Sequence, residues 1–223
     1  MKILDVKQGS SEWLYARLGI PTASELDALI TPLWKLRTGE GPETYLYQKL
    51  TERVLGFPQT DASSWAMEQG TILEGEAIPL YEGVFDVTVQ RVGFITTDDG
   101  RFGCSPDGLI GDDNGIEVKC PQPKTHLKYL LEGGVPKDYL AQVHGAMYAT
   151  GRPRWTFLSY SRQFPPLIVH VERDEAIQTA IAAALDKFKS AFDAKLTQIR
   201  AMKDADNAEK QAAYEAKGPD TSR

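Results

Sequence analysis

The chain contains few of the residues that build disulfide or zinc frameworks. Its 223 residues include two cysteines and three histidines, too few for a disulfide-stabilised fold. Cys104, Cys120 and the histidines form no CxxC or HxxxH pair, so a structural zinc site is not expected. We expect the two cysteines to be reduced and to behave as small apolar side chains.

Long apolar segments are also missing. No apolar run approaches the roughly 20 residues that span a bilayer. The first residues, "MKILDVKQGSSEW", have no apolar segment before their first charges, so no secretory signal is visible. We therefore expect a cytoplasmic protein with no membrane partner.

Several enzyme motifs are incomplete. Gly103 and Gly108 have the glycine spacing of a P-loop, but Leu109 and Ile110 stand where Lys and Ser or Thr are needed. A calcium loop would place Ile110 at its first ligand position and Pro121 at its twelfth. G-x-S-x-G and HExxH motifs are absent, which argues against the corresponding hydrolases.

Charge is present, but it is unevenly distributed. The net charge of −6 argues against a globally basic, indiscriminate nucleic-acid binder. Residues 61–118 carry 12 acidic and 2 basic side chains, and residues 119–172 carry 7 basic and 3 acidic ones. Because clustered carboxylates attract cations and a basic surface attracts anions, the junction of the two blocks is the first candidate for a site.

The hydrophobic pattern changes from helical to alternating and back along the chain. It predicts helices at 22–30, from about 42 to 56, at about 64–80, at 135–150 and from 174 onward, and strands at 84–95, 101–110, 115–120, 154–160 and 166–172. This order indicates a single α/β domain with a central mixed β-sheet flanked by helices. We assign residues 1–203 to the domain, whereas the charged segment 204–223 is expected to be a helical extension or disordered.

The segment "CSPDGLIGDDNGIEVKC", residues 104–120, lies at the junction of the charge blocks. Alternation along a strand places Glu117 and Lys119 on one face. Asp107 lies one strand earlier, where Pro106 and Gly108 interrupt pairing and let it turn inward. Two converging carboxylates need a positive charge nearby, and hard oxygen ligands select Mg²⁺ or Mn²⁺. The same pattern is also typical of a charged, solvated hairpin, so the residues alone leave both interpretations open.

Four separated segments, in the same order over most of residues 6–172, resemble the bacteriophage lambda exonuclease family. They are "VKQGSSEWLYARLGIPTASELDALI", "GTILE", "CSPDGLIGDDNGIEVKCP" and "YLAQVHGAMYAT". The members of this family are alkaline exonucleases of phages and prophages within the PD-(D/E)xK superfamily. The resemblance implies a restriction-endonuclease-like core.

The resemblance also implies a metal site. Asp107 and Glu117 match the metal-binding carboxylates, and the main-chain carbonyl of Val118 matches a further ligand. Lys119 matches the lysine that orients or activates the attacking water, and Glu74 matches an additional acid on a helix. The cofactor expected from this match is Mg²⁺ or Mn²⁺, with two ions in each active site.

A second group of residues matches the family's pocket for the 5′-phosphate of the digested strand. Arg17, Ser24, Ser105 and Gln142 are the matching positions, and an arginine fork with neutral donors suits a phosphate. Met67 falls where the family places an apolar wedge at the terminal base pair. Ordinary solvated or core positions would explain each of these residues equally well when taken alone.

The sequence departs from the family in two places. Residues 31–44 match poorly, which leaves any minor-groove contact there undefined, and the segment after Lys203 is unlike the family.

From the matching segments we predict a Mg²⁺-dependent exonuclease that digests duplex DNA from a 5′ end and leaves 3′ overhangs for phage-type recombination. The resemblance implies a ring-shaped homotrimer and a phage-type single-strand annealing partner. The alternatives are a structure- or site-specific endonuclease with the same metal core, and a non-catalytic DNA-end-binding module.

Overall fold

A computed structural model describes the backbone of residues 1–58 and 65–217, and the side chains of these residues except 65–72, 211 and 213–217. Within these ranges no helix is both long enough and apolar enough to cross a membrane. The predicted wedge, Met67, lies outside the described side chains.

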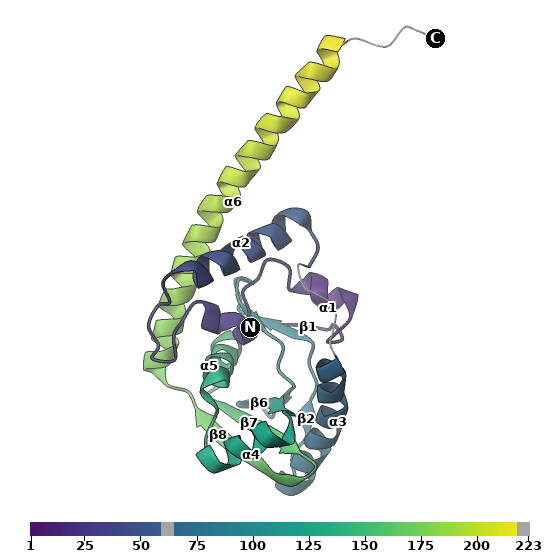
Figure 1. Cartoon of the computed structure of the whole chain (residues 1–223), viewed down its shortest axis with the longest axis vertical. Helices are drawn as coiled ribbons and strands as arrows, with labels where there is room; N and C mark the ends of the chain where they lie inside the picture. The colour runs from purple at the N-terminus through teal and green to yellow at the C-terminus, as the bar shows by residue number, and fades with distance from the viewer. Residues whose placement is uncertain (59–64, 218–223) are drawn as a thin grey trace, which may run out of the picture.

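A five-stranded mixed sheet forms the centre of the molecule (Figure 1). Its strands, in spatial order, are β2 (Val89–Gln90), β5 (Gly108–Ile110), β6 (Asn114–Lys119), β7 (Arg154–Ser161) and β8 (Phe164–Glu172). The β6–β7 pair is parallel, and the other neighbours are antiparallel. A smaller antiparallel sheet joins β1 (Lys2–Leu4), β3 (Phe94–Thr96) and β4 (Gly103–Cys104).

Helices cover the central sheet and extend beyond it. They are α1 (Ser11–Ala16), a 3₁₀ helix (Ala23–Ala28), α2 (Glu40–Leu55), α3 (Trp65–Phe85), α4 (Pro123–Glu132), α5 (Lys137–Thr150) and α6 (Glu175–Lys217). The single α/β domain with a mixed sheet between helices confirms the predicted fold class.

Different helices bury the two faces of the central sheet. One hydrophobic cluster joins α3 to Ile116, Val118 and Leu158. A larger cluster joins α5 and α6 to Trp155 and Phe157. Because side chains alternate along a strand, the residues of β6 that do not face α3 point toward α5.

Many of the predicted elements are present. The predicted helices at 42–56, 135–150 and from 174 onward correspond to α2, α5 and α6, and the strands at 115–120, 154–160 and 166–172 correspond to β6, β7 and β8. Gly56 ends α2 in a left-handed conformation (φ 74°) and accounts for the stop signal there. Helix α6 continues without a break across position 203, the expected end of the domain.

The strand predicted at 84–95 is wrong. Helix α3 continues to Phe85, and Asp86 then adopts a positive φ of 53°. The carboxylate of Glu82 accepts the main-chain amide of Val89 (2.7 Å) and so fixes the turn after the helix. What remains of the segment divides into β2 and β3, which belong to different sheets.

Two further predictions need correction. The strand predicted at 101–110 divides into β4 and β5, which belong to different sheets. Residues 105–107 connect them and belong to neither sheet. The helix predicted at 22–30 is a shorter 3₁₀ helix. Thr22 does not cap it with its side chain, because the hydroxyl donates to the Glu25 carboxylate instead (2.8 Å).

The sequence patterns did not predict three elements. These are β1, α1 and α4. Helix α4 carries usable signals, since Pro123 stands at its first turn and Gly133 ends it with a φ of 64°. Helix α1 is only six residues long, too short for a periodic pattern to be seen.

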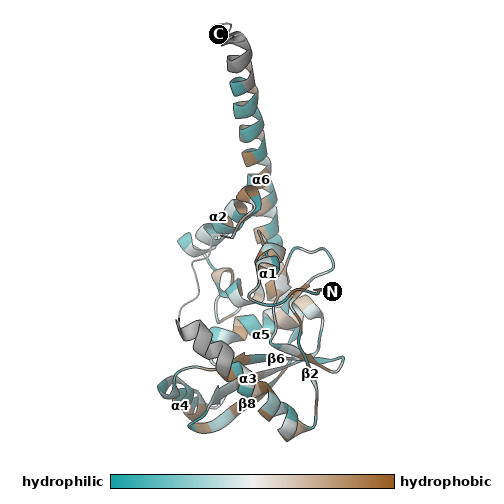
Figure 2. Ribbon diagram, turned by 90° about the vertical axis from the view of Figure 1, so that its right-hand side faces the viewer, coloured by the Kyte–Doolittle hydropathy of each residue, from teal (hydrophilic) through white to brown (hydrophobic). Residues whose placement is uncertain are grey.

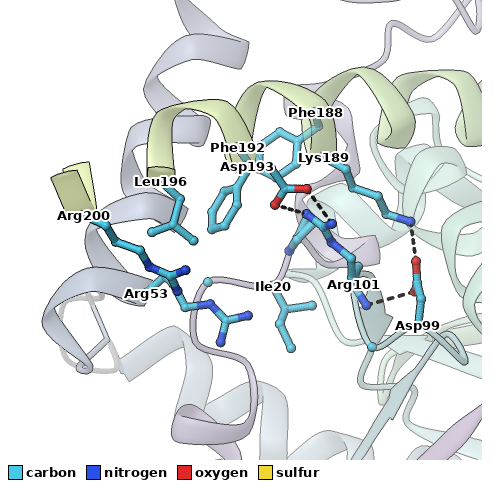
Figure 3. Close-up of a pocket in the computed structure, with 13 residues that line it drawn as sticks. Ile20, Arg53, Asp99, Arg101, Phe188, Lys189, Phe192, Asp193, Leu196 and Arg200 are labelled. Atoms are coloured by element: carbon cyan, nitrogen blue, oxygen red, sulfur yellow. Dashed lines mark hydrogen bonds and ion pairs between the residues drawn. The ribbon is translucent and has the colours of Figure 1, made fainter. Parts of the chain in front are cut away.

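Helix α6 packs on α2 and α5 near its start and then extends away from the body of the molecule (Figure 1). Its outer part is mostly hydrophilic in Figure 2, and residues 201–210 are exposed. Ion pairs from Lys189 to Asp99 (2.8 Å) and from Asp193 to Arg101 (2.6 Å) attach α6 to the turn that precedes β4. Beside them lies a pocket of about 380 Å³ between α6, this turn and the residues around Ile20 (Figure 3).

The attachment of α6 should weaken in acid. Burial alone would raise the pKa of Asp99, but Lys189, Thr97 and the Arg101 amide lower it to about 2. A depressed carboxyl pKa stabilises the fold above the unfolded value of about 3.9, and this stability is lost as the pH falls toward 2. Because Asp99 is half exposed, we expect Asp99→Asn to lower the free energy of unfolding at pH 7 by about 0.5 to 1 kcal/mol. Urea denaturation from pH 7 to 3 should show this difference shrinking, and equal midpoints at pH 7 would contradict the assignment.

Candidate active site

The end of the β5–β6 pairing brings two carboxylates together. The last paired residues are Gly108 and Ile116, so Asp107 and Glu117 occupy the next opposed positions. A Cβ on Gly108 would lie 2.2 Å from Val89 Cγ1, so only glycine lets β2 pack closely at this point. The local sequence therefore places Asp107 where the ladder ends.

Glu117 is buried on the face of β6 that points toward α5. Its side chain is 4% exposed, and its Oε1 lies 2.6 Å from Lys119 Nζ and accepts a hydrogen bond from Gln142 Nε2 (2.6 Å). Lys119 also lies over the ring of Tyr139 (5.1 Å). Burial raises the pKa of Glu117, although Lys119 and Gln142 oppose the rise.

Asp107 binds the main chain of the strand opposite. Its Oδ2 accepts the amide of Val118 (2.6 Å), which replaces a ladder hydrogen bond. Burial raises the pKa of Asp107 well above its ordinary value, and Glu117 and then Glu74 raise it further. The N–H and C=O of one strand residue point to the same side, so the Val118 carbonyl faces the side on which Asp107 lies.

Arg91 connects Glu74 to the Asp107–Glu117 pair. Glu74 forms an ion pair with Arg91, whose Nη1 also donates to the main-chain oxygen of Asp107 (2.9 Å). Glu74 raises the pKa of both Asp107 and Glu117. The third acid thus lies near the two carboxylates, and a neighbouring cation neutralises it.

The donors around this pair suit a hard divalent cation. Within the described part of the chain, no three His, Cys, Asp or Glu side chains are close enough to hold a metal ion by themselves. Lys119 compensates only part of the negative charge of these two buried carboxylates, whose pKa values stay raised. Their oxygens with the Val118 carbonyl form the kind of set that Mg²⁺ or Mn²⁺ takes. Glu74 could join this set if it left Arg91.

The residues matched to a phosphate pocket form a second cluster. Arg17 stacks on the ring of Trp13 (4.2 Å) and donates to the Thr22 hydroxyl (3.3 Å). Thr22 is hydrogen-bonded to Ser24 (3.2 Å), and Trp13 Nε1 donates to Ser105 Oγ (2.8 Å). Three of the four matched residues therefore meet through Trp13 and Thr22, and we call this group the Arg17 cluster.

The two clusters adjoin each other. Ser105 and Asp107 are two residues apart on one segment. Cys104 is buried beside them, and burial raises the pKa of its thiol; Glu117 raises it further, whereas Arg17 lowers it. The fourth matched residue, Gln142, binds Glu117 of the first cluster rather than the Arg17 group.

Sequence reasoning missed several residues that hold these clusters in place. Gln8 donates to the main-chain oxygens of Pro106 (2.8 Å) and Val92 (3.0 Å), and Trp13 and Arg91 bind the same loop. Gln8 and Trp13 are the first and last residues of "QGSSEW", a Q-G-x-x-x-W motif within the first of the four matching segments. The motif marked the resemblance, but only the structure shows that it anchors residues 105–107.

The raised pKa of Asp107 makes a testable prediction about stability. Because the pKa of Asp107 is higher in the folded state, ionising it lowers the free energy of unfolding. This loss is complete at pH values above the folded-state pKa and is absent below the unfolded-state pKa of about 3.9. Asp107→Asn keeps an oxygen for the Val118 amide and should raise the Tm of the metal-free protein at pH 7, with the gain vanishing near pH 4. Asp112→Asn, at an exposed position of the β5–β6 turn, serves as the control. A lower Tm for Asp107→Asn at pH 7 would contradict this account.

Known proteins share sequence and fold with this chain. The YqaJ-like viral recombinase domain matches residues 12–153, more than half of the chain. The structure is similar to an alkaline exonuclease, LHK-Exo from Laribacter hongkongensis, with 30% identity, 88% of this chain and 99% of that chain covered, and a TM-score of 0.79. The same values hold for the structure of LHK-Exo in complex with dAMP.

A phage related exonuclease from Haemophilus somnus 129PT shares the fold at 14% identity, with 81% of this chain and 96% of that chain covered and a TM-score of 0.61. No protein of curated function matches. The comparisons confirm the resemblance to phage exonucleases. The chain belongs to the YqaJ-like viral recombinase family.

Proposed function

We propose that this protein is a Mg²⁺- or Mn²⁺-dependent exonuclease that digests one strand of linear duplex DNA from its 5′ end. The observation that carries the proposal is the adjacency of the Asp107–Glu117 pair to the Arg17 cluster, which share the segment 105–107. A 5′-phosphate held by the second cluster places the neighbouring phosphodiester at the first. Such an arrangement favours cleavage near an end over cleavage within a duplex.

Each residue of the first cluster has a role in hydrolysis. Asp107, Glu117, the Val118 carbonyl and Glu74 would hold two ions, and these would supply positive charge for the phosphate oxygens. Lys119, 2.6 Å from Glu117 Oε1, orients the attacking water. Gln142 fixes the Glu117 carboxylate by donating to the same oxygen. Burial excludes bulk water and strengthens these electrostatic contacts.

The family also suggests a biological setting. One structure of LHK-Exo holds dAMP, and we propose that this chain likewise releases deoxynucleoside monophosphates. The 3′ overhangs would then serve phage-type homologous recombination with a single-strand annealing protein. A ring-shaped homotrimer around the duplex, acting in the cytoplasm of the host cell, completes the proposal. The PD-(D/E)xK core is represented by Asp107, Glu117 and Lys119.

Removing a carboxylate of the pair should abolish cleavage. We expect Asp107→Ala and Glu117→Ala each to lower kcat at least about 10³-fold, equivalent to about 4 kcal/mol of barrier. Release of mononucleotides from linear duplex with Mg²⁺ measures the loss, and circular dichroism verifies the fold. Turnover close to that of wild type in both variants would remove the metal-site assignment. Cutting of covalently closed circular duplex by the wild type would favour an endonuclease instead, and DNA-end binding with no product would favour a non-catalytic module.

The Arg17 cluster should make digestion sensitive to the chemistry of the 5′ end. A charge-assisted contact is worth roughly 1.5 to 3 kcal/mol, so a 5′-phosphorylated duplex should be digested faster than the same duplex with a 5′-hydroxyl. Arg17→Ala should shrink this difference far more than it slows the 5′-hydroxyl substrate. Initial rates on the two ends measure the effect. Equal rates in the wild type would reject the pocket and leave the metal site standing.

A further inference from the structure

A network of charges, buried at Lys49 and Glu52 and partly exposed at Glu25, adjoins the Arg17 cluster. Lys49 on α2 is 5% exposed, and its Nζ lies 3.1 Å from Glu25 Oε2 and 3.3 Å from Glu52 Oε2. Glu52, 4% exposed, also accepts the main-chain amide of Gly19 (3.1 Å). Burying charged groups opposes folding unless they are fully paired, and apolar side chains of the same size are often as stable. The network is therefore poorly explained by stability alone.

Glu25 connects this network to the cluster. Glu25 Oε2, the oxygen that pairs with Lys49, also accepts hydrogen bonds from the hydroxyls of Thr22 (2.8 Å) and Tyr45 (3.1 Å). Thr22 in turn receives the hydrogen bond from Arg17 and meets Ser24. A single hydroxyl thus separates the Glu25 carboxylate from two of the residues proposed to bind phosphate.

The packing of α2 keeps the network against the cluster. Gly19 has a φ of 66°, and a Cβ there would lie 2.8 Å from Arg53 Cβ and 3.1 Å from the Lys49 carbonyl oxygen. Only glycine lets α2 approach the chain this closely, two residues after Arg17. The loop that carries Arg17 and the helix that carries Lys49 are consequently in direct contact.

The carboxylate of Glu25 creates an electrostatic conflict beside an anion site. Burial alone would raise its pKa, but Lys49 first, and then Thr22 and Arg17, bring the pKa below its ordinary value. Glu25 is therefore ionised at neutral pH and repels an incoming phosphate. Arg17 also acts on Glu25, so without Lys49 it would pair with the carboxylate and be lost to the ligand.

We propose that Lys49 is a positioning residue for the 5′-phosphate pocket: it neutralises Glu25, keeps the Thr22 hydroxyl in place and leaves Arg17 available to the phosphate. The inference rests on the proposed 5′-phosphate pocket and assigns the specificity for phosphorylated ends partly to a residue that touches no DNA.

The experiment compares initial rates on 5′-phosphorylated and 5′-hydroxyl linear duplexes. Lys49→Met should reduce the phosphate preference at least about tenfold, the size of one charge-assisted contact, through a higher KM on the phosphorylated end. The rate on the 5′-hydroxyl end should change much less. Lys49→Met/Glu25→Gln should recover most of the preference, because the uncompensated carboxylate is gone. A purely structural role for Lys49 predicts no such recovery.

Two further variants keep the test decisive. Arg152→Met removes another buried cation, 7% exposed and bonded to the carbonyls of Gly111 and Asn114, and should destabilise the protein without changing the ratio of the two rates. Glu25→Gln alone retains the Lys49–Glu52 pair and should keep or increase the phosphate preference. This variant tests the role of Lys49 even if Lys49→Met does not fold.

The outcomes separate this inference from the proposed function. An unchanged ratio in Lys49→Met, or a lost preference in Glu25→Gln, overturns the role of Lys49 and leaves the pocket standing. A wild type with no preference overturns the pocket and the inference together.

Discussion

The pairing of β5 with β6 ends at Gly108 and Ile116, and this end determines where the two central carboxylates lie. Beyond it the carboxylate of Asp107 takes the Val118 amide that a continuing strand would have used. A hydrogen bond to the Asp107 side chain thus replaces the strand pairing next to Glu117, whose own side chain points toward α5. The parallel pairing of β6 with β7 holds the other edge of β6, so the site lies on a rigid strand rather than on a loop.

Negative charge at buried and partly buried positions is the second constraint. Glu117 lies against Lys119, Glu74 against Arg91, and Glu25 and Glu52 share Lys49. Each cation lowers the cost of burying a carboxylate. In the first cluster the compensation is incomplete, since the pKa values of Asp107 and Glu117 stay raised. This residual demand for positive charge supports a metal site at the Asp107–Glu117 pair.

The segment 105–107 joins the two halves of the proposed chemistry because it belongs to neither sheet. Gln8 and Trp13 hold it from the N-terminal region, and Arg91 holds it from the link between β2 and β3. A strand running from β4 into β5 would have directed these side chains to alternate faces. The break lets the segment contact the Arg17 cluster at one end and the carboxylate pair at the other.

Periodicity predicted the longer elements. Strands β6 and β7 are buried over almost their whole length, and helices α2, α5 and the first part of α6 carry regularly spaced apolar residues that pack in the core. The periodic pattern failed where the surroundings of the chain change within a few residues, as at 84–95. Val84 and Phe85 have the residue types of a strand, but they are exposed and form the end of helix α3. The expectation for Gln142 was also incomplete, because a sequence match cannot show that its amide reaches Glu117.

The sequence by itself determined the alternation that places Glu117 and Lys119 on one face, the turn residues that release Asp107, and the motifs that identify the family. These depend on local geometry and on residue types at fixed spacing. Only the tertiary structure decided that Gln8 and Trp13 hold the Asp107 loop and that Lys49 lies between the buried Glu52 and the partly buried Glu25. Such contacts join residues far apart in the chain, and their strength depends on burial, which no local pattern of residues specifies.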